Sequence, residues 1–335
     1  MSASAVISTG QSICYNTFGH EIPCLSTGQD AAINSGIKHP DRRFQVDKGM
    51  VWDSLTGLIW TQNANPNEFP VTWQEALDLT MEMNLNNTLD CNDWRLPNRR
   101  ELHSLMHYQT KKPSLPPDHP FNNYFLGWYW TSSSAAINPA YAWNIHLEGA
   151  RMFYSSKDDY RLFWPVRGKG KDVVTVTGQT VCFGQNGGET PCLGSGQDGA
   201  LQLGRKWPEP RFEDREETVY DRLTNLCWLK EATLTTKPVD WHTALSLVTK
   251  MRSQKMYGRS NWRLPNILEL ESLTDCSQFD PALPTGHLFT EIQNAYWSST
   301  TSFYETDWAW VYYVIKGALG VGYKPKEDFF VWAVS

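Results

Sequence analysis

The feature that most constrains this chain of 335 residues is an internal repeat at a spacing of 168. The pentapeptide WRLPN occurs at residues 94–98 and again at 262–266. The spacing slips to 167 between YWTS at 129–132 and YWSS at 296–299. A register held over this length indicates a duplicated domain, and two copies are too few for a solenoid. We therefore predict two globular domains: copy 1 (residues 9–168) and copy 2 (residues 177–335), with a linker at residues 169–176.

Composition excludes several classes of protein. A net charge of -6 provides no basic field for a phosphate backbone, so nucleic acid is not an expected partner. The longest apolar runs are far shorter than the roughly 20 residues of a spanning helix, so membrane insertion is not expected. The first residues are too short and too polar for a signal peptide, so we expect any export signal to be absent from this sequence.

Local patterns indicate strands, then two helices, then a sheet in each copy. Residues 14–24 and 182–192 carry turn-forming clusters between paired cysteines, which predicts clasped hairpins. Thr72 and Glu75 form a capping box before one helix, and Asn98 with Glu101 forms a second. Residues 141–148 alternate as in a strand. The fold class is therefore predicted to be α+β.

These motifs together carry a family resemblance. LTGLIWT at 55–61, TWQEA at 72–76, DWRLPN at 93–98, YWTSS at 129–133 and YAW at 141–143 resemble the Legionella collagen-like protein C-terminal domain family, and copy 2 repeats them. The resemblance implies tandem C-type-lectin-like domains, each with two helices, a small twisted antiparallel sheet and an N-terminal disulfide-clasped hairpin. It also implies an exported bacterial protein, with adhesion and glycan binding proposed for some members.

The seven cysteines divide into repeated and unrepeated positions. Cys14 with Cys24 and Cys182 with Cys192 have the same spacing in both copies, which favours two local disulfides over reduced pairs. Such disulfides point to an oxidising compartment. Cys227 and Cys276 both replace bulky residues of copy 1, which leaves open either a third bridge between them or two buried free thiols.

We predict ligand-binding residues where the two copies differ most. The loop at residues 134–140 is replaced by a different loop at 302–307, while the adjoining strands keep their register. Recognition residues concentrate on variable loops held by rigid elements. The predicted ligand-binding residues are Asn138, Tyr141, Asn144 and His146 in copy 1, and Tyr304, Asp307, Trp308 and Tyr312 in copy 2. Recurring tryptophans such as Trp60 and Trp130 are expected in the core, and the unrepeated Trp128 and Trp308 are expected to be exposed.

Catalytic and metal motifs are weak. His103 and His107 have zinc-ligand spacing but lack the other ligands, so we expect solvated helix histidines. No cofactor is expected; a structural calcium is possible but no motif supports it. Formylglycine-generating enzymes share the implied fold but use a reactive cysteine pair that copy 1 lacks, so an enzyme is not expected.

Two functions of different class follow from these observations. The first is an extracellular or cell-surface module that binds glycans through aromatic loops and mediates adhesion. The alternative is a protein-ligand display scaffold, such as the variable proteins of diversity-generating retroelements. In both, the partner is a glycan or protein on another surface.

Overall fold

The computed structural model describes residues 4–335 and shows an α+β protein in which the two copies repeat one order of elements. Copy 1 contains β1 (Cys14–Tyr15), β2 (Glu21–Ile22), α1 (Asp30–Ile33), β3 (Phe44–Asp47), β4 (Met50–Asp53), β5 (Ile59–Thr61), α2 (Trp73–Leu85), η1 (Thr88–Asp90), α3 (Arg99–His103), β6 (Trp128–Ser134), β7 (Tyr141–His146), β8 (Met152–Ser156) and β9 (Val166–Arg167). Copy 2 contains β10 (Cys182–Phe183), β11 (Glu189–Thr190), α4 (Asp198–Leu201), β12 (Phe212–Arg215), β13 (Thr218–Asp221), β14 (Leu226–Leu229), α5 (Trp241–Ser253), η2 (Met256–Gly258), α6 (Ile267–Ser272), β15 (Tyr296–Thr301), β16 (Trp308–Tyr313) and β17 (Ala318–Tyr323).

Polar caps fix where the main helices begin. The Thr72 side chain accepts from the Glu75 N–H, and the Glu75 carboxylate accepts from the Thr72 N–H at 2.8 Å. Asn98 and Glu101 form the same reciprocal pair before α3, and Asn266 and Glu269 repeat it before α6. Each box satisfies backbone donors that the first turn leaves free. The predicted capping boxes are confirmed.

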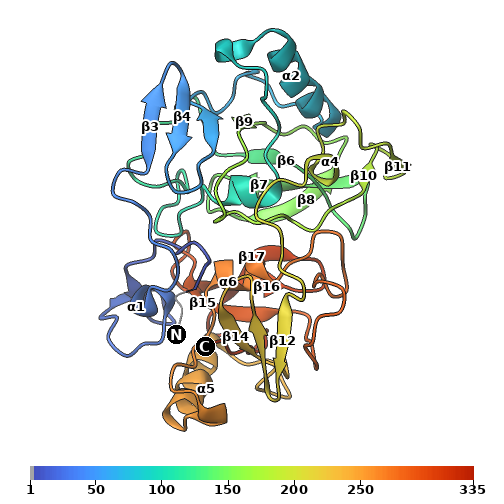
Figure 1. Cartoon of the computed structure of the whole chain (residues 1–335). Coiled ribbons are helices and arrows are strands. Elements are labelled where there is room, and N and C mark those ends of the chain that lie inside the picture. Colours follow the sequence, from blue (N-terminus) through green and yellow to red (C-terminus); the bar gives the residue numbers. More distant parts are fainter. Residues whose placement is uncertain (1–3) are drawn as a thin grey trace.

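The main sheets of the two copies join into one. Its strand order is β15-β16-β17-β8-β7-β6, and all described pairings between neighbours are antiparallel. Leu319 of β17 pairs with Met152 of β8. The two residues are equivalent in the repeat, because Leu319 also pairs with Tyr312 and Met152 also pairs with Ile145, the equivalent of Tyr312. Matching residues therefore meet at an approximate two-fold axis, and the six-stranded sheet runs through the middle of the molecule (Figure 1).

The N-terminal segment of each copy packs on the other copy. The Gln11 side chain donates to the Thr301 carbonyl at 2.6 Å and accepts from its N–H at 3.1 Å. The Gln179 side chain bonds the backbone of Ser134 in the same way, at 2.5 and 3.1 Å. Figure 1 shows the result, with α1 beside β15 and α4 beside β6. Each repeat of the sequence thus contributes to both globular halves.

A buried aspartate anchors each exchanged segment. Asp30 accepts from Thr9 in its own segment and from Thr300 in copy 2, both at 2.7 Å. Asp198 accepts from Thr177 at 2.7 Å and from Ser133 in copy 1 at 2.5 Å. Burial, which outweighs the hydroxyl donors, raises the pKa of Asp30 and of Asp198 to about 6.

Disulfides clasp both small hairpins. Cys14 bonds Cys24 and Cys182 bonds Cys192, as the shared spacing predicts. A third bridge is absent, because Cys227 and Cys276 are both buried free thiols. The Cys227 backbone pairs with Ser335, whereas the Cys276 N–H donates to Thr177 of the exchanged segment. The two cysteines therefore serve different packing layers, and the bridge hypothesis is wrong.

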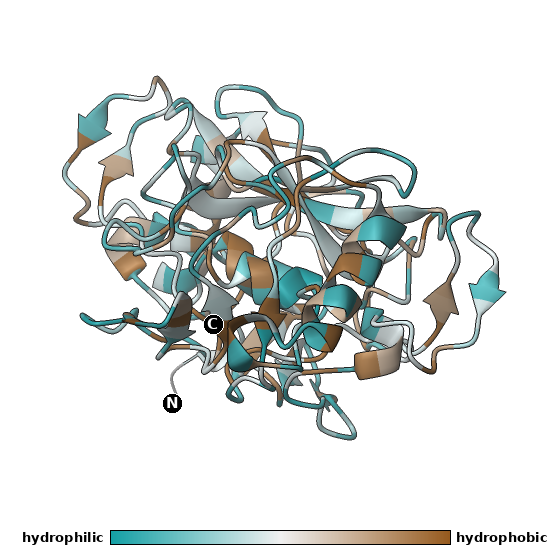
Figure 2. Ribbon diagram, turned by 90° about the horizontal axis from the view of Figure 1, so that it is seen from above, coloured by the Kyte–Doolittle hydropathy of each residue, from teal (hydrophilic) through white to brown (hydrophobic). Residues whose placement is uncertain are grey.

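The recurring tryptophans form the core, as predicted. Trp60, Trp130 and Trp143 are buried, and so are their counterparts Trp228, Trp297 and Trp310. Seen from above, hydrophobic residues lie mostly toward the middle of the molecule and many outer loops are hydrophilic (Figure 2). Between residues 4 and 335, no helix combines the length and apolar character needed to cross a bilayer.

The exchange predicts a crossed pattern of amide protection. Gln11→Ala removes a side chain that bonds both the N–H and the carbonyl of Thr301, so hydrogen exchange should accelerate at the Thr301 amide in copy 2. Gln179→Ala should accelerate exchange at Ser134 in copy 1 and leave Thr301 unchanged. Hydrogen exchange read by NMR measures both amides. Faster exchange confined to the copy that carries the substitution would contradict the exchanged arrangement.

The buried aspartates predict a dependence of stability on pH. Because their folded pKa of about 6 lies above the ordinary value of 3.8, their contribution is full below 3.8 and is lost as pH rises through 6. The unfolding free energy of the wild type should rise by on the order of 2 kcal/mol per site as the pH falls from 7 to 4. The Asp30→Asn, Asp198→Asn double variant lacks both carboxyl groups, so it should not show this rise. Urea denaturation across this range measures the difference. Parallel curves for the two proteins would refute it.

Candidate functional site

The predicted ligand-binding residues of copy 1 do not share one surface. Asn138 is exposed at the tip of the loop after β6, and Tyr141 is half-buried with its ring 6.1 Å from that of Tyr154. Asn144 is buried and donates to Ser155 at 2.8 Å. His146 is half-buried, and its ring lies edge-on to Trp128 at 4.7 Å. Strand alternation places Tyr141 on the opposite face from Asn144 and His146.

The predicted residues of copy 2 are also divided. Tyr304 is 36% exposed and donates to Glu148 of copy 1 at 3.2 Å. Asp307 and Trp308 are half-buried, and Trp308 lies 5.6 Å from Tyr323. Tyr312 is fully buried against Thr274. Tyr312 and Asn144 therefore have no open surface to offer a ligand.

The loop at residues 302–307 holds the exchanged hairpin of copy 1. The Thr306 hydroxyl donates to the Gly19 carbonyl at 2.8 Å. Gly19 has a φ of +80°, and an added Cβ would lie 2.8 Å from the Thr306 hydroxyl, so only glycine fits this approach. Part of the variation between the two loops thus reflects packing inside the molecule.

A buried lysine lies beneath each hairpin. The Lys324 ammonium lies 4.2 Å from the Trp241 ring centroid and donates to the carbonyls of Thr306 and Asn16. Lys157 occupies the matching place over Trp73 at 3.9 Å and donates to Phe183 and Gly184. Burial lowers the pKa of both lysines to about 7. Neither ammonium faces solvent, so both fix the hairpins and are not ligand contacts.

A groove of about 690 Å³ opens between the hairpin of copy 1 and helix α5 of copy 2. The hairpin side supplies Tyr15, Asn16, Thr17, Ile22, Ser26, Thr27 and Gln29. The helix side supplies Trp241, His242, Leu245, Ser246, Thr249, Lys250 and Ser253. Most of these residues carry a hydroxyl, amide or imidazole group, although apolar atoms make up more of the lining surface. His242, Ser246 and Lys250 are exposed along the outer face of α5. The groove exists only because the hairpin crosses to the other copy.

Sequence reasoning missed this groove and the aromatic ring next to it. Phe18 is 70% exposed in the hairpin turn, directly after the groove residue Thr17. Copy 2 has Asn186 at the matching position. The unrepeated Phe18 could have indicated an exposed aromatic ring. It lies more than two hundred residues before α5, so the sequence did not indicate that the hairpin and α5 form a groove together.

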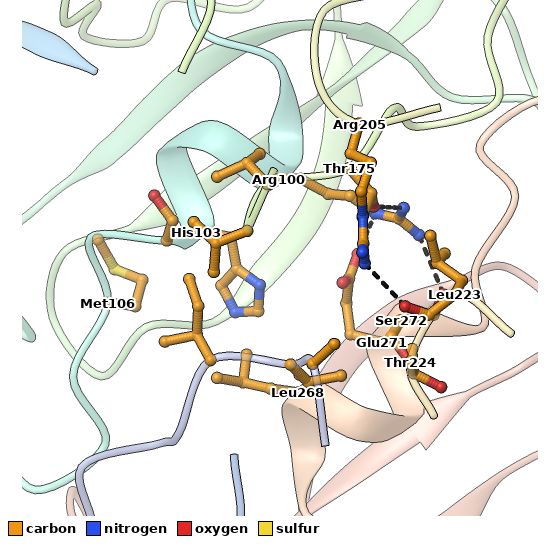
Figure 3. A pocket seen from close by; sticks show the side chains of 16 residues that line it. Arg100, His103, Met106, Thr175, Arg205, Leu223, Thr224, Leu268, Glu271 and Ser272 are labelled. Atoms are coloured by element: carbon orange, nitrogen blue, oxygen red, sulfur yellow. Dashed lines mark hydrogen bonds and ion pairs between the residues drawn. The ribbon is translucent and has the colours of Figure 1, made fainter. Parts of the chain in front are cut away.

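A smaller cavity of about 70 Å³ lies where α3 and α6 meet near the two-fold axis. Figure 3 shows His103 in its middle, with Met106 on one side and Arg100 and Glu271 on the other. Arg100 Nε lies 3.5 Å and Arg99 Nη2 lies 3.4 Å from the Glu271 carboxylate. The volume suits a few water molecules, and a sugar or peptide would not fit.

The expectation of solvated helix histidines is wrong, because His103 is buried and His107 is half-buried and lies beyond the end of α3. His103 is buried with Nε2 2.6 Å from the Tyr108 hydroxyl, and burial lowers the pKa of His103 to about 4. The His107 ring packs edge-on against His39 at 5.4 Å, and burial lowers its pKa to about 4 as well. The exchanged segment packs on the turn after α3, where the Tyr108 N–H donates to the Thr9 carbonyl at 2.9 Å. Within residues 4–335, no three acidic, histidine or cysteine side chains gather as metal ligands.

Comparison with known proteins places the chain in a family. No curated protein matches it. The family profile of the Lcl C-terminal domain matches residues 49–167 and residues 217–335, which together make up more than half of the chain and coincide with the later part of each repeat. The chain therefore belongs to the Lcl C-terminal domain family and carries two tandem copies of that domain.

Proposed function

We propose that this protein is an extracellular or cell-surface module that binds a glycan in the groove between the clasped hairpin and helix α5. The observation that carries the proposal is the groove itself, at about 690 Å³. Ligand sites typically measure 300–1,000 Å³. We further propose that each half is a C-type-lectin-like domain, since each places two capped helices, a one-turn helix and long loops around a small antiparallel sheet.

The chemistry of the groove suits sugars. Asn16, Thr17 and Ser246 offer hydroxyl and amide groups that can both donate and accept hydrogen bonds, as sugar hydroxyls require. His242 on the helix and Phe18 beside the groove supply exposed rings. An aromatic face packs against the C–H face of a sugar, so the ring and the polar groups serve complementary parts of one ligand.

The disulfides support an exported protein. Both hairpins that border exchanged segments are closed by Cys–Cys bonds, which form and persist in oxidising compartments. An adhesive role on a cell surface is consistent with that location.

A binding role is also favoured over thiol-based catalysis. Cys276 is the only cysteine in the C-terminal part of copy 2, and burial raises its pKa to about 12. A catalytic cysteine needs an accessible thiolate. The buried Cys276 side chain meets neither condition.

The proposal predicts the effect of removing the two exposed rings. A glycan array probed with the full chain should identify a ligand, and the Phe18→Ala, His242→Ala double variant should bind it about tenfold more weakly. Both residues are exposed, so the melting temperature should stay close to that of wild type. Isothermal titration calorimetry measures the affinity and circular dichroism measures the fold.

Two matched variants locate the site. Asn186→Ala alters the equivalent turn of the other hairpin and should bind as wild type. Tyr304→Ala tests the loop surface predicted from the sequence. Weaker binding by Tyr304→Ala alone would assign the ligand to that loop, and the absence of any bound glycan would refute the function.

A further inference from the structure

A second groove, of about 720 Å³, lies between helix α2 of copy 1 and the exchanged segment of copy 2. Met81, Trp94, Leu193, Leu201 and Leu203 are among the residues that line it, and apolar atoms make up most of its surface. Leu193 is 98% exposed, and Met81 and Leu201 are exposed as well. Large apolar side chains that gather around an open groove mark a surface that another molecule covers.

The helix beside this groove carries charge of one sign. Residues 73–90, which span α2 and η1, contain four acidic residues and no basic residue. They are Glu75, Asp78, Glu82 and Asp90, and all four are exposed. Glu82 lies in the last turn of α2, where the helix dipole disfavours negative charge, so its charge does not serve the helix itself. The apolar groove is therefore bordered by an acidic surface.

The equivalent surface of copy 2 carries the opposite sign. Residues 241–258, which span α5 and η2, contain Lys250, Arg252 and Lys255 with one histidine, and no acidic residue. Lys250 is the equivalent of Glu82, and both side chains are exposed. Tyr257 in η2 adds an exposed aromatic ring to this basic surface. The two copies have thus kept one helix and reversed its charge.

The two charged surfaces lie at opposite ends of the molecule. Figure 1 shows α2 at the top and α5 at the bottom, with the six-stranded sheet between them. They cannot meet within one chain, but the acidic surface of one chain can meet the basic surface of another. Contacts between two α2 surfaces or between two α5 surfaces would bring like charges together. Charge complementarity therefore favours a contact between unlike ends.

We propose that the apolar groove beside α2 is a docking site for a second copy of this chain, which enters it with its α5–η2 surface. Tyr257 of the second copy packs on Met81 and Leu201, and its Lys255 faces the carboxylates around the groove. Because the two surfaces are different patches, the contact is heterologous and each molecule keeps one free surface at either end of an assembly. The molecules therefore associate end to end. The inference does not depend on the glycan proposal.

Sedimentation velocity of the full chain, without glycan, tests the contact over a range of protein concentrations and at two ionic strengths. The weight-average mass should rise with concentration and fall at high salt, because salt screens exposed charges. Glu82→Lys should weaken the association about tenfold. It should not unfold α2, because it places a positive charge in the last turn, four residues after Asp78.

The opposite surface has its own variants. Lys255→Glu reverses a charge outside the hairpin groove and should weaken the association to a similar extent. Tyr257→Ala changes no charge and should weaken it at high salt as well as at low salt. An excess of Glu82→Lys added to the wild type should shorten the assemblies, because this variant retains only its α5 surface.

Glu231→Lys is the matched control. It makes the same change of net charge at an exposed residue outside both surfaces, and it should associate as wild type. The proposal is overturned if the wild type stays monomeric at millimolar concentration and low salt. It is also overturned if Glu82→Lys and Glu231→Lys change the association equally.

Discussion

Backbone pairing between β17 and β8, together with the crossed N-terminal segments, is the constraint on which the rest of this structure depends. A small antiparallel sheet has two edges with unpaired backbone groups, and each copy covers one edge with the other. The same contact brings α3 and α6 together and brings the copy 1 hairpin to α5. Both the interior cavity and the proposed glycan groove are therefore products of the duplication, since neither copy could form them alone.

The junction is symmetric in backbone and asymmetric in chemistry. Arg99 and Arg100 of copy 1 correspond to Ile267 and Leu268 of copy 2, and His103 corresponds to Glu271. Across the axis the arginines thus meet a carboxylate. Copy 2 paired with itself would bury Glu271 opposite Leu268, at a cost of several kcal/mol for an unpaired charge. We infer that the two copies have diverged to prefer each other.

The sequence could predict those features that depend on residues close together in the chain or on the repeat. The capping boxes, the clasped hairpins and the tryptophan core depend on neighbours a few residues away or on the repeat itself, so they were readable. The exchange of the N-terminal segments could not be predicted, because Gln11 and Gln179 are equivalent residues and the sequence does not indicate which copy each of them contacts. The predicted binding residues failed to converge for a related reason. Loop variation was assigned to a ligand, whereas Thr306 and Tyr304 also contact the other copy.

The exchanged segments also bear on assembly. Bonds such as Gln11 to Thr301 can be satisfied within one chain or between two chains, because both routes offer the same partners. The short linker at residues 169–176 keeps the partner segment at high effective concentration, which favours the closed form. Once the molecule is closed, both exchanged segments are engaged within one chain, so exchange with a second chain would first require one of them to be released.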